Sequence, residues 1–386
     1  MELILDMELE TFDKFILKSP NVNIMQTSAW AKLKDGDWKP HYLGFKENDK
    51  IVACALLLER SAFLGYSMFY CSRGFAIDYH NEELLEDIIK LTKEYVKKEK
   101  GFLLRFDPEL PLYKKDSRTS EIIEDNTEIF NIINKRAKNT GLDKSMDSTF
   151  QPRFQMVVNL KDGELKEKVK SKKRRLVNDN YIDTRGYKII ENTNVEGVKE
   201  FARLSHLTEL KQGVALRNED YFMKMYDMFK DSNNIKIFMA QVEIDILIEQ
   251  IKSTSNKEEE INKLEEIKKE KGNIVNTNAI ICIYGTDMVQ MFYGASDDDF
   301  SRYKAGYKLH FHAMEDAQNL GYSYFNLGGV AGTLDDGLTR FKSEFHPELF
   351  EYVGDFDVVV NSFVYKLFIK GLPLMKKALR KIRKND

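Results

Sequence analysis

The chain has few cysteines and no long apolar run. Its 386 residues include three cysteines, Cys54, Cys71 and Cys282, which lie far apart within apolar stretches. We read them as buried thiols of a protein in a reducing compartment. No apolar run approaches the roughly 20 residues that a membrane span requires, and the acidic start, residues 1–6, is too short for a signal peptide. We therefore expect a cytoplasmic protein.

Several catalytic signatures are also missing. The sequence contains neither a G-x-S-x-G nor a G-x-x-x-x-G-K-[ST] segment, which argues against a nucleophile elbow and a nucleotide phosphate loop. His310 and His312 would lie about 200° apart around a helix, so they cannot share a metal, and the other histidines are scattered. We expect no metal and no cofactor. The net charge of −3 means that any contact with nucleic acid requires a local basic patch.

Length and periodicity predict two domains of mixed α/β type. A chain of 386 residues is too long for one ordinary core. Before residue 150, apolar runs at 51–58, 67–71 and 102–106 predict strands and 82–98 predicts a helix. A second copy of this layout begins at residue 154. We therefore place one domain at 1–149, with 353–386 packed on it, and the other at 150–352.

An arm is expected inside the second domain. Apolar residues recur at helical spacing on both sides of a turn at 253–256, which predicts an antiparallel helical hairpin over 244–273, inserted between two strands. Either the arm is a solvated insertion, or it contacts RNA or a partner protein.

The region 288–345 has the pattern of a crossover unit. A strand at 288–293, a helix at 305–320 and a strand at 322–327 precede the pair Gly328-Gly329. A site is expected where the carboxyl ends of such strands open. The loop beyond carries Phe341 and Lys342, an aromatic residue beside a cation.

Two segments are rich in lysine and arginine. Residues 164–180 predict a basic helix that is either a solvated face or a track for RNA phosphates, which would bind in a salt-dependent way without sequence reading. Residues 363–384 are amphipathic and basic. They either pack on the body of the protein or dock on an anionic membrane surface.

Six short motifs follow one another along nearly the whole chain. They are MQTSAWAKLK at 25–34, LRFDPE at 104–109, QPR at 151–153, NLGG at 326–329, GLTRFK at 337–342 and EYVGD at 351–355. In this order they resemble the Fem family of aminoacyltransferases, which build the interpeptide bridge of peptidoglycan. One departure is Phe75, which follows Arg73-Gly74 where the family usually has proline; we expect it to alter the wall of the binding groove.

The resemblance implies a fold and a reaction. The fold is α/β (α+β), with two GNAT-like acyltransferase domains and a coiled-coil arm. The reaction adds glycine, alanine or serine from aminoacyl-tRNA, as co-substrate, to the stem-peptide amine of lipid II or UDP-MurNAc-pentapeptide. Partners would then include aminoacyl-tRNA, the precursor, the inner face of the membrane and other Fem-type proteins.

The resemblance also implies roles for single residues. Lys342 would stabilise the oxyanion or the leaving oxygen, and Phe341 would position the acceptor end of the tRNA. The diphosphate of the precursor would meet ligands that correspond to Lys34, Arg217 and Tyr221. We expect Tyr221 to lie one helical turn from Arg217, on the same helix face. From its place at the end of a strand, Asp107 is a candidate base or amine-positioning group, and Tyr293 at another strand end is a weaker candidate.

Two alternatives stay open. An acyl-CoA-dependent N-acyltransferase would bind pyrophosphate on a glycine loop at a helix start, but residues 301–307 lack the glycine spacing and Tyr307 stands where a small residue is needed. A non-catalytic scaffold would use the arm and the tail to dock partners.

Overall fold

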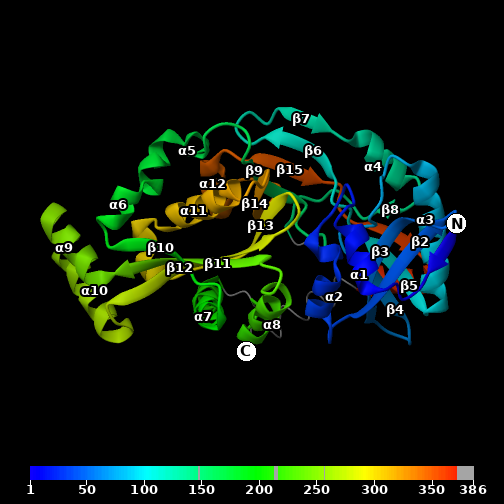
Figure 1. Ribbon diagram of the computed structural model, residues 1–386, viewed down its shortest axis with the longest axis horizontal. Coiled ribbons are helices and arrows are strands. Elements are labelled where there is room, and N and C mark those ends of the chain that lie inside the picture. The colour runs from blue at the N-terminus through cyan, green and yellow to red at the C-terminus, as the bar shows by residue number, and fades with distance from the viewer. Residues whose placement is uncertain (147, 213–215, 256, 372–386) are drawn as a thin grey trace. The chain divides into compact units, whose positions relative to one another are not determined.

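The computed structural model describes residues 1–146, 148–212, 216–255 and 257–371. The chain forms two compact units (Figure 1). Unit 1 contains residues 1–155, 329–336 and 349–386, and unit 2 contains residues 156–328 and 337–348. The strands β9 (Phe154–Asn159) and β15 (Glu348–Tyr352) contribute residues to both units.

Unit 1 is built on a seven-stranded sheet in the order β1-β2-β3-β4-β5-β16-β8. Its helices include α3, whose apolar stripe packs on the sheet and whose first turn is capped by the Asn81 side chain. The strands are β1 (Glu2–Ile4), β2 (Lys39–Glu47), β3 (Lys50–Ser61), β4 (Ser67–Cys71), β5 (Gly101–Phe106), β8 (Lys138–Asn139), β16 (Phe356–Val359) and the hairpin β6 (Pro111–Asp116) and β7 (Ile122–Asp125). The helices are α1 (Leu9–Ile16), η1 (Ile24–Gln26), α2 (Ser28–Lys34), α3 (Glu82–Lys98) and α4 (Thr127–Asn134), and residues 362–371 are also helical.

Unit 2 has its strands in the order β10-β11-β12-β13-β14. The strands are β10 (Tyr187–Glu191), β11 (Ile235–Glu243), β12 (Ile274–Tyr284), β13 (Met288–Ser296) and β14 (Tyr324–Val330). The helices are α5 (Leu165–Lys168), η2 (Ser171–Val177), α6 (Asp179–Asp183), α7 (Val195–Gln212), α8 (Glu219–Phe229), α9 (Ile244–Thr254), α10 (Glu258–Lys271), η3 (Asp298–Tyr303), α11 (Gly306–Asn319), α12 (Gly337–Lys342) and η4 (Ser343–Phe345).

The two units repeat one arrangement. In each, antiparallel strands lead to a strand, a helix and a second strand parallel to the first: β4-α3-β5 in unit 1 and β13-α11-β14 in unit 2. The expected strand-helix-strand crossover is therefore confirmed. The parallel register of β13 with β14 runs from Met288↔Tyr324 to Gln290↔Asn326, and the residues that follow on both strands carry the site described below.

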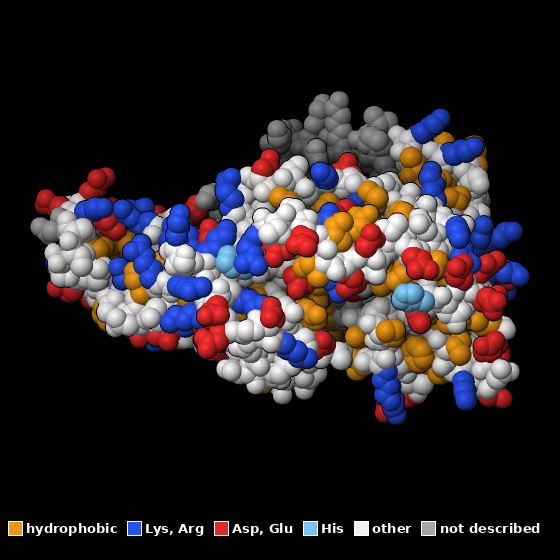
Figure 2. All heavy atoms as spheres, turned by 90° about the horizontal axis from the view of Figure 1, so that it is seen from above, with side chains coloured by type: hydrophobic (Ala, Val, Ile, Leu, Met, Phe, Trp, Pro, Cys, Tyr) orange, Lys and Arg blue, Asp and Glu red, His pale blue; other side chains and the backbone are white. Residues whose placement is uncertain are grey.

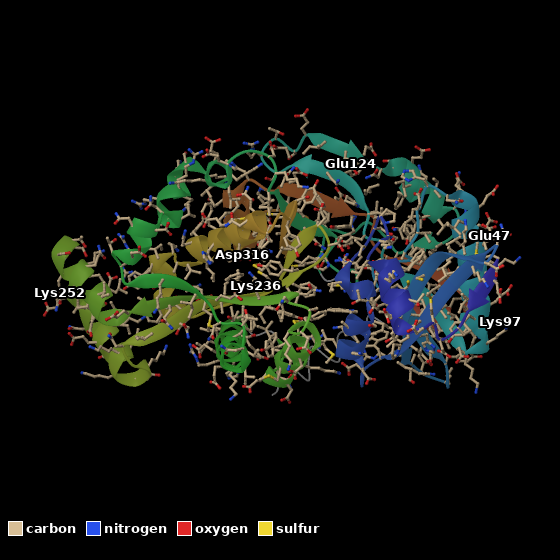
Figure 3. All side chains as sticks on the ribbon, in the orientation of Figure 1. Glu47, Lys97, Glu124, Lys236, Lys252 and Asp316 are labelled. Atoms are coloured by element: carbon tan, nitrogen blue, oxygen red, sulfur yellow. The ribbon has the colours of Figure 1, made fainter. Side chains whose placement is uncertain are left out.

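Helix α11 is tied to its sheet by a partly buried polar contact. The Lys236 ammonium of β11 lies 2.8 Å and 2.9 Å from the two carboxylate oxygens of Asp316 on α11, and Tyr284 donates to the same carboxylate at 2.6 Å. Figure 3 shows Lys236 and Asp316 side by side. This cross-link fixes the rotation of α11, whose first turns carry residues of the site.

The arm is a pair of helices between two strands. α9 and α10 follow β11 and precede β12, as predicted. Their apolar residues, Leu247, Ile248, Ile251, Ile261, Leu264 and Ile267, are buried between them. Lys268 near the end of α10 lies 2.5 Å from Asp245 at the start of α9, so the helices are antiparallel.

The prediction of one basic helix over 164–180 is wrong. The chain instead forms α5, η2 and α6 with extended residues between them, because Val169 turns into the core and Asn178 caps α6 by accepting from Asn180 N–H. Figure 2 shows Lys and Arg side chains gathered on the face of unit 2 that carries α5 and α6. The segment is basic and surface-exposed, but its charges do not follow a single helical stripe.

Candidate active site

Lys342 is a buried cation whose ammonium lies against strand β14. It closes α12 and is only 3% exposed. Gly328 in β14 has φ +86°, and a Cβ added there would lie 3.4 Å from Lys342 Nζ and 3.3 Å from the carbonyl oxygen of Met291 in β13. The ammonium thus lies where the parallel register of β13 and β14 ends. Gly328 is needed both for the backbone conformation and for the space that Lys342 fills.

Phe341 belongs to an aromatic cluster beside Lys342. Its ring centroid lies 4.9 Å from Tyr307, 4.9 Å from His310 and 5.7 Å from Phe345. Tyr307 and His310 are one turn apart at the start of α11, so one helix face holds the Phe341 ring. Phe341 itself is half-buried, which leaves part of the ring open to a ligand.

His310 adds no charge to this cluster. Its Nδ1 is 2.7 Å from the carbonyl oxygen of Gly306, which makes Nδ1 the donor. Burial, together with the nearby charge of Lys342, lowers the pKa of His310 to about 4. The imidazole is therefore neutral at pH 7, and Lys342 is the cation of the site.

Arg217, Tyr221 and Tyr293 form a second cluster of unit 2. The Arg217 guanidinium lies over the Tyr221 ring, 4.8 Å from its centroid, and the hydroxyl of Tyr293 lies 3.4 Å from that of Tyr221. Arg217 precedes Asn218, the N-cap of α8, so the expectation that it shares a helix with Tyr221 is wrong. The stacking nevertheless brings the two residues together, beside Tyr293, which lies within β13 and not at its end.

The motif at residues 25–34 of unit 1 has two parts with separate roles. Gln26 stabilises the turn at residues 73–74, and helix α2 carries Lys34. Gln26 donates to the carbonyl oxygens of Arg73 and Gly74 at 3.2 Å each. Trp30 is 4% exposed, and its ring lies 4.3 Å from the Lys34 ammonium. Helix α2 therefore positions Lys34 while the buried glutamine fixes the turn at residues 73–74.

Asp107 lies at the centre of a buried polar network in unit 1. Its Oδ1 accepts from Tyr70 at 2.7 Å and from Arg73 N–H at 2.8 Å. The Arg73 guanidinium is 3.7 Å from Oδ2, and its Nε lies 2.9 Å from Glu109. Burial raises the pKa of Asp107 to about 6. Asp107 is thus held in place by Tyr70 of β4 and by Arg73 of the turn that follows it, with a pKa close to neutral pH.

Asp355 is a second buried carboxylate of this network, and sequence reasoning did not single it out. Its Oδ2 accepts from Phe150 N–H at 3.2 Å and lies 3.8 Å from Arg105. Burial raises its pKa to about 7, and the Asp107 charge contributes. Arg105 is engaged mainly by Asp357, at 2.7 Å and 2.8 Å. The motif EYVGD was the available signal, because its last residue is this aspartate.

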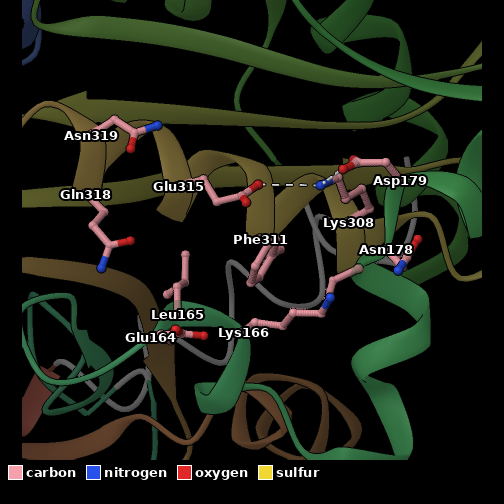
Figure 4. A pocket seen from close by; sticks show the side chains of 11 residues that line it. Glu164, Leu165, Lys166, Asn178, Asp179, Lys308, Phe311, Glu315, Gln318 and Asn319 are labelled. Atoms are coloured by element: carbon pink, nitrogen blue, oxygen red, sulfur yellow. Dashed lines mark hydrogen bonds and ion pairs between the residues drawn. The ribbon is translucent and has the colours of Figure 1, made fainter.

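A pocket of about 370 Å³ adjoins α11 on a neighbouring face (Figure 4). Lys308 in its wall is buried, 2.7 Å from Asp179 and 3.4 Å from Glu315, and 5.2 Å from the Phe311 ring centroid. These contacts join α6 to α11. We assign Lys308 a structural role, since it is already held by two carboxylates.

The start of α11 is filled by aromatic side chains. Tyr307 is 8% exposed and packs on Phe341, and Lys173 of η2 lies 5.3 Å from its ring centroid. Sequence reasoning used Tyr307 only as a residue too large for a glycine loop and His310 only as a non-ligand. Their spacing of three residues was the available signal, because it places both side chains on one face of a helix.

Phe75 does not line a groove. It is fully buried, its ring lies 5.2 Å from that of Phe106, and its N–H donates to the Tyr79 hydroxyl at 2.8 Å. The expected change to the groove wall is therefore wrong, because the residue belongs to the core of unit 1. Proline at this position would lack the donor that Tyr79 accepts.

The three cysteines are free and buried, as predicted. None of the helices in the described part of the chain combines the length and apolarity that a transmembrane helix needs. Within the same residues, His, Cys, Asp and Glu side chains nowhere gather in a group of three that could hold a metal ion.

Comparison with solved structures gives the fold. A chain described as "Crystal structure of FemX" superposes with a TM-score of 0.78 at 21% identity, covering 95% of this chain and 99% of that one. A tandem GNAT protein from the clavulanic acid biosynthesis pathway superposes with a TM-score of 0.53 at 8% identity, covering 93% and 98%. The expected pair of GNAT-like folds is confirmed.

Comparison with curated proteins and family models gives the family. A protein of Staphylococcus epidermidis named lipid II:glycine glycyltransferase is 27% identical, with 96% of each chain covered. Its namesake from Staphylococcus aureus is 24% identical, again with 96% of each chain covered. The model of the FemAB family matches residues 7–260 and 247–370. Because these matches span nearly all of the sequence, the chain belongs to the FemAB family.

Proposed function

We propose that this protein is an aminoacyltransferase that adds an amino acid to the stem peptide of a peptidoglycan precursor and so builds the interpeptide bridge. The amino acid comes from aminoacyl-tRNA, and the acceptor is the side-chain amine of the stem peptide on lipid II. The observation that carries the proposal is the buried Lys342 beside Phe341, in a chain whose full-length relatives are named lipid II:glycine glycyltransferases. No cofactor is required, since the aminoacyl ester is already activated.

The reaction is aminolysis of an ester. The acceptor nitrogen attacks the ester carbonyl, the C–N bond forms, and a tetrahedral oxyanion collapses with cleavage of the bond to the ribose oxygen. The proton lost by the amine balances the proton gained by the ribose hydroxyl. Lys342 stabilises the negative charge on the oxyanion or the departing oxygen. Since its side chain is 3% exposed, little water screens this interaction.

Phe341 holds the acceptor end of the tRNA in this proposal. Its ring is braced by Tyr307, His310 and Phe345, so a base or ribose stacked on its open part would meet a rigid surface. Such fixation supplies part of the rate enhancement by keeping the ester carbonyl next to Lys342.

The diphosphate of the precursor would bind to cations and to hydroxyl groups that donate hydrogen bonds. Arg217 and Tyr221, stacked on each other, and Tyr293, which is hydrogen-bonded to Tyr221, form such a group in unit 2. Arginine suits phosphate because it donates in a bidentate manner. Lys34 of unit 1 is assigned the same class of ligand.

Asp107 is proposed as an amine-positioning group or base. Its pKa of about 6 leaves it largely ionised at pH 7, so it can attract the acceptor ammonium and take its proton. Both carboxylate oxygens of Asp107 already contact Tyr70 or Arg73. These contacts favour a role in positioning the amine over a role as the base that removes its proton.

Two rival functions make different demands. An acyl-CoA N-acyltransferase would have to place a pyrophosphate where Tyr307 packs on Phe341, and calorimetric binding of coenzyme A would support that rival. A scaffold that docks partners through the arm formed by α9 and α10 would bind substrates without transferring any aminoacyl group.

The test is transfer of radiolabel from a pool of charged tRNAs to lipid II, in parallel with UDP-MurNAc-pentapeptide. We expect label in the lipid-linked product and its loss when Lys342→Ala and Arg217→Ala are combined. Repeats with single charged tRNAs, beginning with glycine, identify the donor. Activity that survives the double substitution would overturn the assignment of the site.

A further inference from the structure

Two segments of unit 1 present apolar side chains to solvent. The loop after β3 carries Leu64, which is 69% exposed, and the helix at residues 362–371 carries Phe363, also 69% exposed, and Leu367, 41% exposed. An isolated exposed apolar residue needs no explanation, but a group at one edge of a unit does.

The two segments share a base. Phe63 of the loop lies 5.9 Å from the ring of Phe102 in β5, and Phe368 of the helix lies 5.2 Å from the same ring. Phe63, Tyr66, Tyr365 and Phe368 all pack on a small core cluster that contains Phe102 and Val364. The loop and the helix therefore lie side by side, although some 300 residues separate them in the sequence.

Leu64 stands in a conformation that a leucine rarely adopts. Its φ is +56° and that of Gly65 is +72°. The loop is closed by bonds from Ala62 N–H to the Tyr66 carbonyl and from Tyr66 N–H to the Phe63 carbonyl, at 3.0 Å and 3.1 Å. Glycine or asparagine would suit this turn better, so leucine at the exposed tip is unfavourable for the isolated fold.

The outer face of the helix alternates apolar and basic residues. Phe363, Lys366, Leu367 and Lys370 are all exposed and follow the spacing of three and four that places them on one face. Val364 points to the core cluster instead, where it is 2% exposed. A purely solvated face would lack the phenylalanine and the leucine, and a protein-binding core would lack the interleaved lysines.

We propose that Leu64, Phe363, Lys366, Leu367 and Lys370 form a docking surface for an anionic phospholipid bilayer. The inference rests on the proposed function in one respect, because a lipid-linked acceptor would place the enzyme at the membrane. Leu64, Phe363 and Leu367 insert at the level of the headgroups. Lys366 and Lys370 lay their methylene stems along the same boundary with their ammonium groups toward lipid phosphates.

Charge complementarity favours this occupant over a second copy of the chain. Beyond the helix the sequence continues with Lys376, Lys377, Arg380, Lys381, Arg383 and Lys384, and residues 372–384 contain no acidic residue. That segment lies outside the described residues. By composition alone it adds six cations to the sequence that follows Lys370, which suits an anionic lipid layer and opposes self-association.

The test is co-sedimentation of the full-length protein with vesicles of phosphatidylcholine alone or with about 30% phosphatidylglycerol, an anionic content that recruits basic surfaces. We expect binding to the anionic vesicles that weakens with salt. Combined Leu64→Ser, Phe363→Ser and Leu367→Ser should lower the partition coefficient about tenfold or more. Combined Lys366→Glu and Lys370→Glu should lower it about tenfold.

Ile122→Ser with Ile123→Ser is the matched control. These residues of β7 are 50% and 57% exposed and lie outside the docking surface, so vesicle binding should be unchanged. Absence of vesicle binding, equal binding of the triple variant, or an equal loss in the control would overturn the proposal. So would a dimer of the wild type that the triple substitution disperses.

Transfer to lipid II dissolved in detergent separates this inference from the proposed function. The triple variant should keep wild-type transfer to this acceptor, because its substitutions lie outside the catalytic group. Vesicle binding without any transfer would remove the proposed function and leave the docking surface intact.

Discussion

Gly328→Ala tests whether the position of Lys342 governs the rate. Gly328 has φ +86°, and the added Cβ would lie 3.3 Å from Met291 O and 3.4 Å from Lys342 Nζ. The left-handed conformation costs an alanine about 1–2 kcal/mol. In addition, the close contacts require Lys342 to shift by about a few tenths of an ångström, and a misplacement of about 1 Å can cost about 10²-fold in rate. We therefore expect kcat to fall about tenfold.

Gly321→Ala is the control that separates strain from crowding. Gly321, in the turn between α11 and β14, has φ +89°, and nothing lies within 4 Å of a Cβ added there. Both variants should lose about 1–2 kcal/mol of unfolding free energy. Only Gly328→Ala should slow transfer, because only there does the methyl group contact the Lys342 ammonium.

The assay is the steady-state rate of transfer from charged tRNA over a range of lipid II concentrations, at a temperature where urea titration shows each variant to be folded. A rate for Gly328→Ala equal to that for Gly321→Ala would refute the reasoning, since strain alone would then account for both. A rise in KM without a change in kcat would place the role of Lys342 in substrate binding and not in the chemical step.

Four further outcomes are expected. Lys342→Ala should lower kcat by about 10²–10³-fold with an unchanged circular dichroism spectrum. His310→Asn should lower kcat about tenfold by loosening Phe341, yet leave the pH–rate profile between pH 6 and 8 unchanged, because the pKa of His310 near 4 keeps it neutral there. Burial raises the pKa values of Asp107 and Asp355 to about 6 and about 7. The unfolding free energy should therefore be highest in mild acid and fall by about 3 kcal/mol as urea titrations move from pH 5 to pH 8, less so in Asp355→Asn. Phe75→Pro should lose about 3 kcal/mol or more in urea titration, and full stability would contradict its place in the core.

Helices and strands of both units could be predicted from the sequence wherever the apolar residues of a segment follow a single period, that of a helix or that of a strand. The helix at 82–98 and the strand at 67–71 have the predicted bounds, because an apolar stripe or run there is bounded by Asn81 or by turns. The prediction of one helix over 164–180 was wrong because no single periodicity extends over that segment. Its lysines and arginines favour a helix, but the buried Val169 and the cap at Asn178 divide it, and burial of one valine is decided by tertiary contacts.

The candidate site shows the same limit. Motif order pointed to Phe341 and Lys342, which are adjacent in sequence, but the partners that hold them come from other elements: Tyr307 and His310 from α11 and Gly328 from β14. A spacing of three residues in α11 indicates a shared face but does not say what that face meets. Only the crossover of β13, α11 and β14 brings the helix start to the strand ends, so the fold had to be known before the site could be completed.

The buried network of unit 1 shows why a motif residue can be identified and its state still be missed. Asp107 is followed by a proline at the end of β5, which the sequence displays directly. Its raised pKa arises from burial, and the Arg73 guanidinium that opposes this shift comes from a turn 34 residues earlier. That turn is held by Gln26, whose amide reaches the carbonyl oxygens of Arg73 and Gly74. The N-terminal motif therefore influences a carboxylate about 80 residues away in sequence by fixing the turn that donates to it. Gln26→Leu should raise the pKa of Asp107 further by releasing Arg73 from Oδ1, and an unchanged Asp107 titration by NMR would show that the turn holds without the glutamine.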